Sequence, residues 1–150
     1  MRRSVTILGA TGSVGGSTLD LIERDPERFE VIALTANCDV EKLAAAAIRT
    51  GARHAVVADE SCLPALRARL AGTGIAAAGG PRAVCEAARM GADWTMAAIV
   101  GLAGLGSAMA AIEGGGTVVL ANKEPLVSAG DLVTAAARRH GATILPADSE

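Results

Sequence analysis

The chain has 150 residues, of which 51% are hydrophobic and 20% charged, so it is long enough to bury a core and too apolar for a disordered protein. Fourteen basic and sixteen acidic side chains give a net charge of −2, which excludes the strongly basic surface that binds nucleic acids or anionic membranes. The two aromatic residues, Phe29 and Trp94, are too few for base-stacking platforms. No apolar run is long enough for a transmembrane helix, and the strand pattern that follows Met1 leaves no room for a signal peptide. We therefore expect a soluble, cytoplasmic domain that contacts neither nucleic acid nor membrane.

The three cysteines, Cys38, Cys62 and Cys85, are odd in number and form no CxxC pair. This usage is typical of a reducing compartment, in which cysteines are packing residues. We therefore expect all three to be unpaired.

Apolar runs alternate with helical patterns along the whole chain. Strands are expected at residues 4–8, 29–35, 54–57, 74–78, 93–97, 117–121 and 143–145. Helices are expected at residues 14–24, 39–49, 61–70, 81–89, 105–113 and 125–139. This alternation predicts an α/β fold of the Rossmann-like, doubly wound type, a mainly parallel sheet with helices on both faces. No linker or repeat divides the chain, so we expect one dinucleotide-binding domain over residues 1–150.

A glycine-rich segment lies between the first expected strand and the first expected helix. Gly9, Gly12 and Gly15 have the spacing G-x-x-G-x-x-G, a variant of the dinucleotide fingerprint. Glycine permits a tight turn that brings backbone N–H groups against a pyrophosphate, and the following helix adds partial positive charge. Thr11 and Ser13 add hydroxyl groups. A plain glycine-rich turn is the alternative, but the position after the first strand favours nucleotide binding.

The end of the second strand leaves the choice between NAD and NADP open. Thr35 lies twenty residues after Gly15, where a carboxylate would indicate a free ribose 2′-hydroxyl. Neutral residues follow, and the first acid is Asp39, which is also a good N-cap for the next helix. No lysine or arginine is present there to meet a 2′-phosphate.

Two polar segments follow the last two expected strands. Asn122, Lys123 and Glu124 come between a strand and a helix, where they either line a ligand crevice or form a helix start. Asp148 and Glu150 follow the last strand two residues apart, so in an extended chain both carboxylates point to one face. They form either a partial site for a hard divalent cation or an acidic tail.

Together these segments resemble the 1-deoxy-D-xylulose-5-phosphate reductoisomerase family. The resemblance is carried by VTILGATGSVG at 5–15, STLD at 17–20, ALTAN at 33–37, AAIVG at 97–101, LANKE at 120–124 and LPADSE at 145–150. It covers the whole chain as the family's amino-terminal NADPH-binding domain. It implies an NADP-dependent enzyme of non-mevalonate isoprenoid biosynthesis, which rearranges 1-deoxy-D-xylulose 5-phosphate by retro-aldol cleavage and re-aldolisation. The product is then reduced to 2-C-methyl-D-erythritol 4-phosphate.

The resemblance also implies roles for individual residues. The cofactor NADPH would be bound by Thr11, Gly12, Ser13, Val14, Asn37, Asp39, Asn122 and Glu124. The phosphosugar substrate would be bound by Lys123, Ser149 and Glu150, and the catalytic residues would be Lys123, Asp148 and Glu150. Asp148 and Glu150 would be two of three carboxylates on Mg²⁺ or Mn²⁺, which would act as a Lewis acid and a template.

This sequence departs from the family pattern at two places. The family commonly has a lysine or arginine and then an asparagine where Cys38 and Asp39 occur here, which leaves no cation for a 2′-phosphate. Pro125 replaces the serine that usually follows Asn-Lys-Glu. The family's third metal carboxylate, catalytic domain and carboxy-terminal helical domain would lie beyond residue 150. We therefore expect an inactive fragment of an enzyme that is a homodimer at full length.

Two other classes of protein share the glycine-rich turn. A semialdehyde-dehydrogenase-like reductase needs a catalytic cysteine, and none of the three cysteines is in a position that resembles one. A non-catalytic nucleotide-sensing module has no need for convergent carboxylates at residues 148 and 150.

Overall fold

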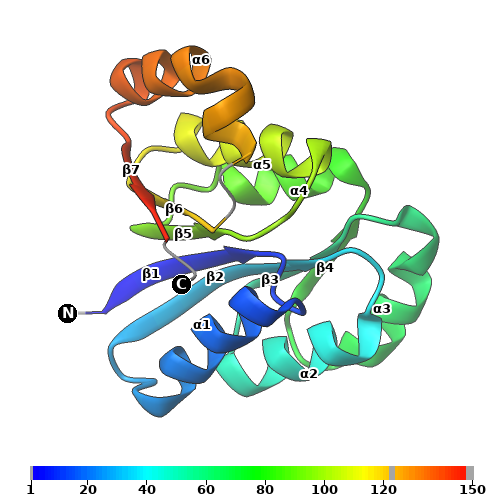
Figure 1. Ribbon diagram of the computed structural model, residues 1–150. Helices are drawn as coiled ribbons and strands as arrows, with labels where there is room; N and C mark the ends of the chain where they lie inside the picture. The colour runs from blue at the N-terminus through cyan, green and yellow to red at the C-terminus, as the bar shows by residue number, and fades with distance from the viewer. Residues whose placement is uncertain (1, 122–123, 148–150) are drawn as a thin grey trace.

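A seven-stranded parallel sheet forms the middle layer of the molecule (Figure 1). The computed structural model describes residues 2–121 and 124–147. The strands are β1 (Arg3–Leu8), β2 (Phe29–Ala36), β3 (His54–Val57), β4 (Ala76–Gly79), β5 (Trp94–Ala97), β6 (Thr117–Leu120) and β7 (Thr143–Pro146). The helices are α1 (Ser13–Arg24), α2 (Val40–Thr50), the 3₁₀ turn η1 (Glu60–Cys62), α3 (Leu63–Leu70), α4 (Pro81–Ala88), α5 (Leu102–Glu113) and α6 (Glu124–His140). This architecture confirms the predicted Rossmann-like α/β fold.

The expected elements are all present; most boundaries agree to within one residue, and three places differ more. The expected helix at 61–70 is divided into η1 and α3, because Asp59 caps the 3₁₀ turn and Pro64 starts the helix anew. Strand β4 begins at Ala76 rather than at residue 74, since Gly74 has a positive φ of 79°. Helix α5 begins at Leu102 rather than at residue 105, so it includes Gly104 as well as Gly106.

The core consists of two apolar layers, one on each face of the sheet. Helices α1, α2 and α3 cover one face, and α4, α5 and α6 cover the other (Figure 1). In β1, Val5 and Ile7 pack with α1 and α2, whereas Leu8 packs with α5 and α6. This alternation follows from the two-residue period of a strand, and burial on both faces explains why the strands are almost continuously apolar. In the part of the chain that the structure describes, no helix is long and apolar enough to cross a membrane.

The strand order reverses beside β1. The order across the sheet is β4-β3-β2-β1-β5-β6-β7, so the chain runs outward from β1 to β4 and then returns to the other side of β1. Residues 5–8 of β1 pair with β5 in parallel register, from Val5 opposite Trp94 to Leu8 opposite Ala97. The loops after β1 and β5 therefore diverge at the carboxyl edge of the sheet, which is where ligands bind in open α/β sheets.

Candidate functional site

A cavity of about 560 Å³ lies at this point of reversal. Its wall is built by the turn after β1, the carboxyl ends of β2 and β3, helix α4, and the loop from β5 into α5. The lining residues are Gly9, Thr11, Gly12, Thr35, Ala36, Asn37, Ala58, Pro81, Val84, Cys85, Ala98, Ile99, Val100, Gly106 and Ser107. The cavity is thus placed where the sequence predicted a nucleotide site.

The turn after β1 is held tightly against α1. Gly9 has a φ of 86°, and its N–H donates to the hydroxyl of buried Thr35 at 3.0 Å. A Cβ on Gly15 would lie only 2.1 Å from the carbonyl oxygen of Gly9, so no other residue fits at this position without moving the backbone. Among the described residues, no side chain caps the first turn of α1, for which Gly12 is the N-cap. The N-terminus of α1 can therefore offer backbone donors and partial positive charge to an anion.

A second glycine turn follows β5 and makes a similar close contact between a helical glycine and a backbone carbonyl. Gly101 is the N-cap of α5 with a φ of 79°, and a Cβ on Gly104 would lie 2.0 Å from the carbonyl oxygen of Ile99. The two turns contact each other, because a Cβ on Gly9 would lie 3.0 Å from the carbonyl oxygen of Ala98. This turn was not predicted. The spacing G-x-x-G at residues 101–104, which repeats that at residues 12–15, was the available signal.

The predicted cofactor residues divide between the cavity and a neighbouring groove. Thr11, Gly12 and Asn37 line the cavity. Ser13 and Asp39 line a more open groove of about 1300 Å³ between α1 and α2, which shares Thr11 and Gly12 with the cavity. Val14, which was also expected at the cofactor, is not among the residues that line either space.

Asp39 has a structural role that the sequence also suggested. Its carboxylate accepts a hydrogen bond from the Lys42 backbone N–H at 3.2 Å and so caps α2. Lys42 lies in the same groove. The loop between β2 and α2 consists of residues 37–39, and all three are exposed.

The predicted substrate and metal residues lie mainly outside the described part of the chain. Asn122, Lys123, Asp148, Ser149 and Glu150 are in this group. Glu124 is the first residue of α6, which agrees with the alternative interpretation of this segment as the start of a helix. Its side chain lies outside the described part of the structure. The strands that precede these segments are neighbours, with Leu120 of β6 paired to Pro146 of β7 in parallel register.

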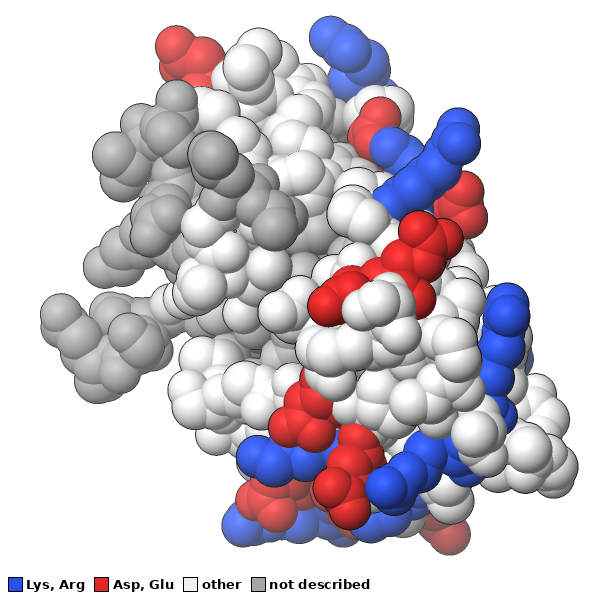
Figure 2. Space-filling view, turned by 90° about the vertical axis from the view of Figure 1, so that its right-hand side faces the viewer, with Lys and Arg blue, Asp and Glu red and all other residues white. Residues whose placement is uncertain are grey.

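Among the described residues, the charged side chains on the face at the carboxyl edge of the sheet form no large patch of one sign. Figure 2 shows acidic and basic residues intermixed over its right-hand and lower parts. This mixture agrees with the formal net charge of −2.

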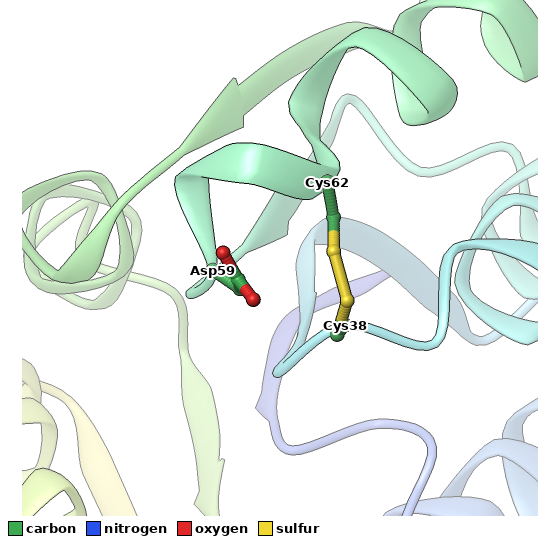
Figure 3. A group of neighbouring side chains, drawn as sticks. All are labelled: Cys38, Asp59 and Cys62. Atoms are coloured by element: carbon green, nitrogen blue, oxygen red, sulfur yellow. A yellow bond between two sulfur atoms is a disulfide. The ribbon is translucent and has the colours of Figure 1, made fainter.

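The expectation of three unpaired cysteines is wrong for two of them. Cys38 and Cys62 form a disulfide with a Cα–Cα distance of 5.9 Å (Figure 3). Neighbouring parallel strands bring the loops after β2 and β3 side by side, so residues 24 positions apart in sequence become neighbours, which spacing alone did not reveal. Cys85 is free, as expected, but it is half-buried on the wall of the cavity, a location that the sequence analysis also missed.

Comparison with known proteins gives a consistent result. Residues 5–130 match a family model described as 1-deoxy-D-xylulose 5-phosphate reductoisomerase. The protein of that name from Zymomonas mobilis is 62% identical over 148 residues, which are 99% of this chain and 38% of the relative. A solved structure of the Z. mobilis reductoisomerase in complex with NADPH matches with a TM-score of 0.97 at 60% identity, over 99% of this chain and 39% of that one. A DOX-P reductoisomerase in complex with NADPH, fosmidomycin and magnesium matches with a TM-score of 0.90 at 42% identity, over 96% of this chain and 36% of that one. The chain thus spans less than two fifths of the length of these relatives.

Proposed function

Because the chain belongs to the 1-deoxy-D-xylulose 5-phosphate reductoisomerase family, we propose that it is the NADPH-binding part of such an enzyme. The complete enzyme then converts 1-deoxy-D-xylulose 5-phosphate into 2-C-methyl-D-erythritol 4-phosphate with NADPH and a divalent cation. The observation that carries the proposal is the cavity between two glycine turns at the reversal of strand order.

The residues of this cavity fit a dinucleotide. The pyrophosphate is an anion, and the N-terminus of α1 faces it with backbone donors, the hydroxyls of Thr11 and Ser13, and no competing acidic residue in the first turn. Close packing at Gly15 keeps the turn and the helix in this relation. In this proposal the adenosine end extends toward Asn37 and the groove between α1 and α2, since the ribose lies at the end of the second strand in this type of fold.

The nicotinamide end is assigned to the β5 side of the cavity. Ile99 and Val100 supply apolar surface there, and Ser107 is buried beside it. When bound, NADPH supplies a hydride to the substrate. The residues of this chain position the cofactor and exclude water from its reactive end. We assign Asn122 and Glu124 to the same end because of the family resemblance.

The substrate and metal are assigned to the segments after β6 and β7. Both strands end at the same edge of the sheet, β6 next to β5 and β7 next to β6, so we assign the segments that leave them to the side of the nicotinamide end. Asp148 and Glu150 offer oxygen ligands, which Mg²⁺ and Mn²⁺ prefer, and Lys123 and Ser149 offer a cation and a hydroxyl to a phosphosugar. A bound divalent cation would polarise the substrate carbonyl.

The proposal is tested by calorimetric titration of the 150-residue chain with NADPH and NADH, before and after the substitution Gly12→Val. Gly12 has a φ of −80°, and a Cβ there would meet only the Gly9 carbonyl oxygen at 3.7 Å. The fold should therefore persist, with a melting temperature lower by no more than about 4 °C because valine is a poor N-cap. NADPH binding should be lost, since the side chain occupies the space where the pyrophosphate approaches the backbone.

A matched control is Gly130→Val in α6, where an added Cβ meets nothing within 4 Å. This variant should bind NADPH as the unmodified chain does. If the unmodified chain binds neither nucleotide, the proposed function is wrong. Unchanged affinity in Gly12→Val would show that the turn after β1 is only a structural connection.

A further inference from the structure

The disulfide between Cys38 and Cys62 lies at the edge of the proposed cofactor site. Cys38 is in the exposed loop between β2 and α2, and Cys62 is the half-buried last residue of η1, which follows β3 (Figure 3). Their Cα–Cα distance of 5.9 Å falls within the ordinary range for a disulfide, so the backbone of the described structure accommodates the bond. Cys38 is accessible to small thiol reagents because its residue surface is exposed.

Both ends of this cross-link adjoin residues of the cavity wall. Asn37 lines the cavity and precedes Cys38, and Ala58 lines it from the segment that leads to Cys62. The backbone N–H of Ala58 donates to the Ala36 carbonyl at 2.8 Å, and that of Asp59 donates to the Asn37 carbonyl at 2.9 Å. The disulfide therefore joins the same two segments that these hydrogen bonds hold together, just beyond the ends of β2 and β3.

We propose that Cys38 and Cys62 form a reversible thiol–disulfide site whose oxidised form binds the dinucleotide more tightly than the reduced form. This inference rests on the proposed function, because it assigns a redox dependence to the same cofactor cavity. It concerns the adenosine end, where the loop after β2 lies, and leaves the glycine turns unchanged.

The oxidant is a low-molecular-weight disulfide, and the exchange is balanced. The thiolate of Cys38, the more exposed of the two, attacks one sulfur of the reagent and releases its other half as a thiolate. The thiolate of Cys62 then attacks the Cys38 sulfur of this mixed disulfide and releases the second reagent thiolate. The protein loses two protons and two electrons, and the reagent becomes two thiols. A dithiol reductant reverses both steps.

The direction of the effect follows from conformational freedom. In the reduced chain, the loop at residues 37–39 keeps its backbone hydrogen bonds and the cap at Asp39, but it is exposed and free of the covalent link. A ligand that contacts Asn37 must then order this loop on binding. The disulfide fixes the loop beforehand, so less entropy is lost when the ligand binds.

Asp59 places a carboxylate beside the two cysteines, so a metal site is the alternative to a thiol–disulfide site here. Ligand atoms of Cys38, Asp59 and Cys62 all lie within 4.8 Å of one another. The Ser61 hydroxyl and then its backbone N–H donate to the carboxylate, at 2.6 and 3.0 Å, and keep the pKa of Asp59 below its usual range. With reduced cysteines, this group is also a set of ligands that zinc accepts, so the test must include the metal.

The experiment uses the 150-residue chain in two states, oxidised with glutathione disulfide or reduced with dithiothreitol in the presence of a chelator. Alkylation of the unfolded protein should modify Cys85 alone in the oxidised state and all three cysteines in the reduced state. Calorimetry should give an NADPH affinity that is weaker by at least about threefold in the reduced state. By reciprocity, saturating NADPH should shift the thiol–disulfide equilibrium in a glutathione buffer by the same factor toward the disulfide.

The matched variant is Cys62→Ser, which cannot form the bond and does not line the cavity. Its NADPH affinity should equal that of the reduced chain and should not respond to dithiothreitol. Equal affinities in the two states of the unmodified chain would overturn the inference, even if the oxidised state melts several degrees higher, because a purely structural disulfide has that effect alone. The zinc content is measured in the unmodified chain and in Cys62→Ser, both purified under reducing conditions without a chelator. One zinc ion per unmodified chain and none in Cys62→Ser would overturn the inference in favour of a metal site. Loss of NADPH binding in both states would instead refute the proposed function on which the inference rests.

Discussion

Replacement of Gly15 by alanine tests whether close packing between the turn after β1 and helix α1 maintains the proposed cofactor site. Gly15 is buried in the first turn of α1. An added Cβ would lie 2.1 Å from the carbonyl oxygen of Gly9 and 2.8 Å from the Cα of Ala10. Both contacts are with backbone atoms, so no side-chain rotation can relieve them.

The size of the effect follows from these distances. A non-bonded carbon and oxygen need roughly 3.3 Å, so the turn and the helix must separate by about 1 Å. Overpacking of this kind costs about 1–3 kcal/mol, against a gain of at most about 1 kcal/mol from the higher helix propensity of alanine. For a chain of this length, we expect a melting temperature lower by about 2–8 °C. A displacement of about 1 Å exceeds the tolerance of a preorganised binding site, so NADPH affinity should fall at least about tenfold.

The assay is thermal unfolding and NADPH titration of Gly15→Ala beside Gly16→Ala. Gly16 is the next residue of the same helix, is exposed, and would place a Cβ with nothing within 4 Å. Gly16→Ala should be as stable as the unmodified chain or more so, and should retain its NADPH affinity within about threefold. If Gly15→Ala matches Gly16→Ala in both measurements, the backbone contact does not position the site, and the reasoning is wrong.

Two further substitutions address charge. Asp39→Asn keeps the side-chain oxygen that caps α2 and removes one negative charge from the groove, so it should strengthen NADPH binding but not NADH binding. If the 2′-phosphate lies about 7 Å from the Asp39 carboxylate in water, the repulsion that the substitution removes is about 1 kcal/mol, or about fivefold in the dissociation constant at low salt. Parallel titrations with NADPH and NADH measure this difference. Asp148→Asn or Glu150→Gln, in a protein with the whole length of the family, should abolish turnover and leave NADPH affinity nearly unchanged, because each change removes a proposed metal ligand. Full turnover of Asp148→Asn at limiting metal would contradict that assignment.

The order of elements was predictable because it depends on local patterns. Largely apolar runs such as residues 29–35 have the composition of strands buried on both faces, and Val31, Ala33, Leu34 and Thr35 of this run are buried between the two helical layers. The cap at Asp39 and the left-handed Gly51 after α2 were likewise visible as helix signals. The predicted starts of β4 and α5 were wrong, and glycines lie at both places. The glycines at 101, 104 and 106 resemble helix breakers in sequence, yet α5 includes two of them.

The site was only partly predictable, because it depends on which strands are neighbours. The sequence indicated Thr11, Gly12 and Asn37, which do line the cavity. It did not indicate Cys85 or Ser107, which reach the cavity only because α4 and α5 pack over the ends of β1 and β5. The same limit explains the disulfide, whose partners become adjacent through the pairing of β2 with β3.

Thr35 shows how the two parts of the proposed site differ. A carboxylate at this position would have indicated a ribose contact, but here the Thr35 hydroxyl accepts the Gly9 N–H and its carbonyl accepts the Ala10 N–H at 2.7 Å. Thr35 is thus buried behind the turn after β1 and supports it. Under the proposed function, nucleotide discrimination is then assigned to residues farther along, in the exposed loop at residues 37–39. This loop is separate from the close backbone contacts at Gly15 and Gly104. We therefore expect Asp39→Asn to alter the preference between the nucleotides and Gly15→Ala to weaken both alike.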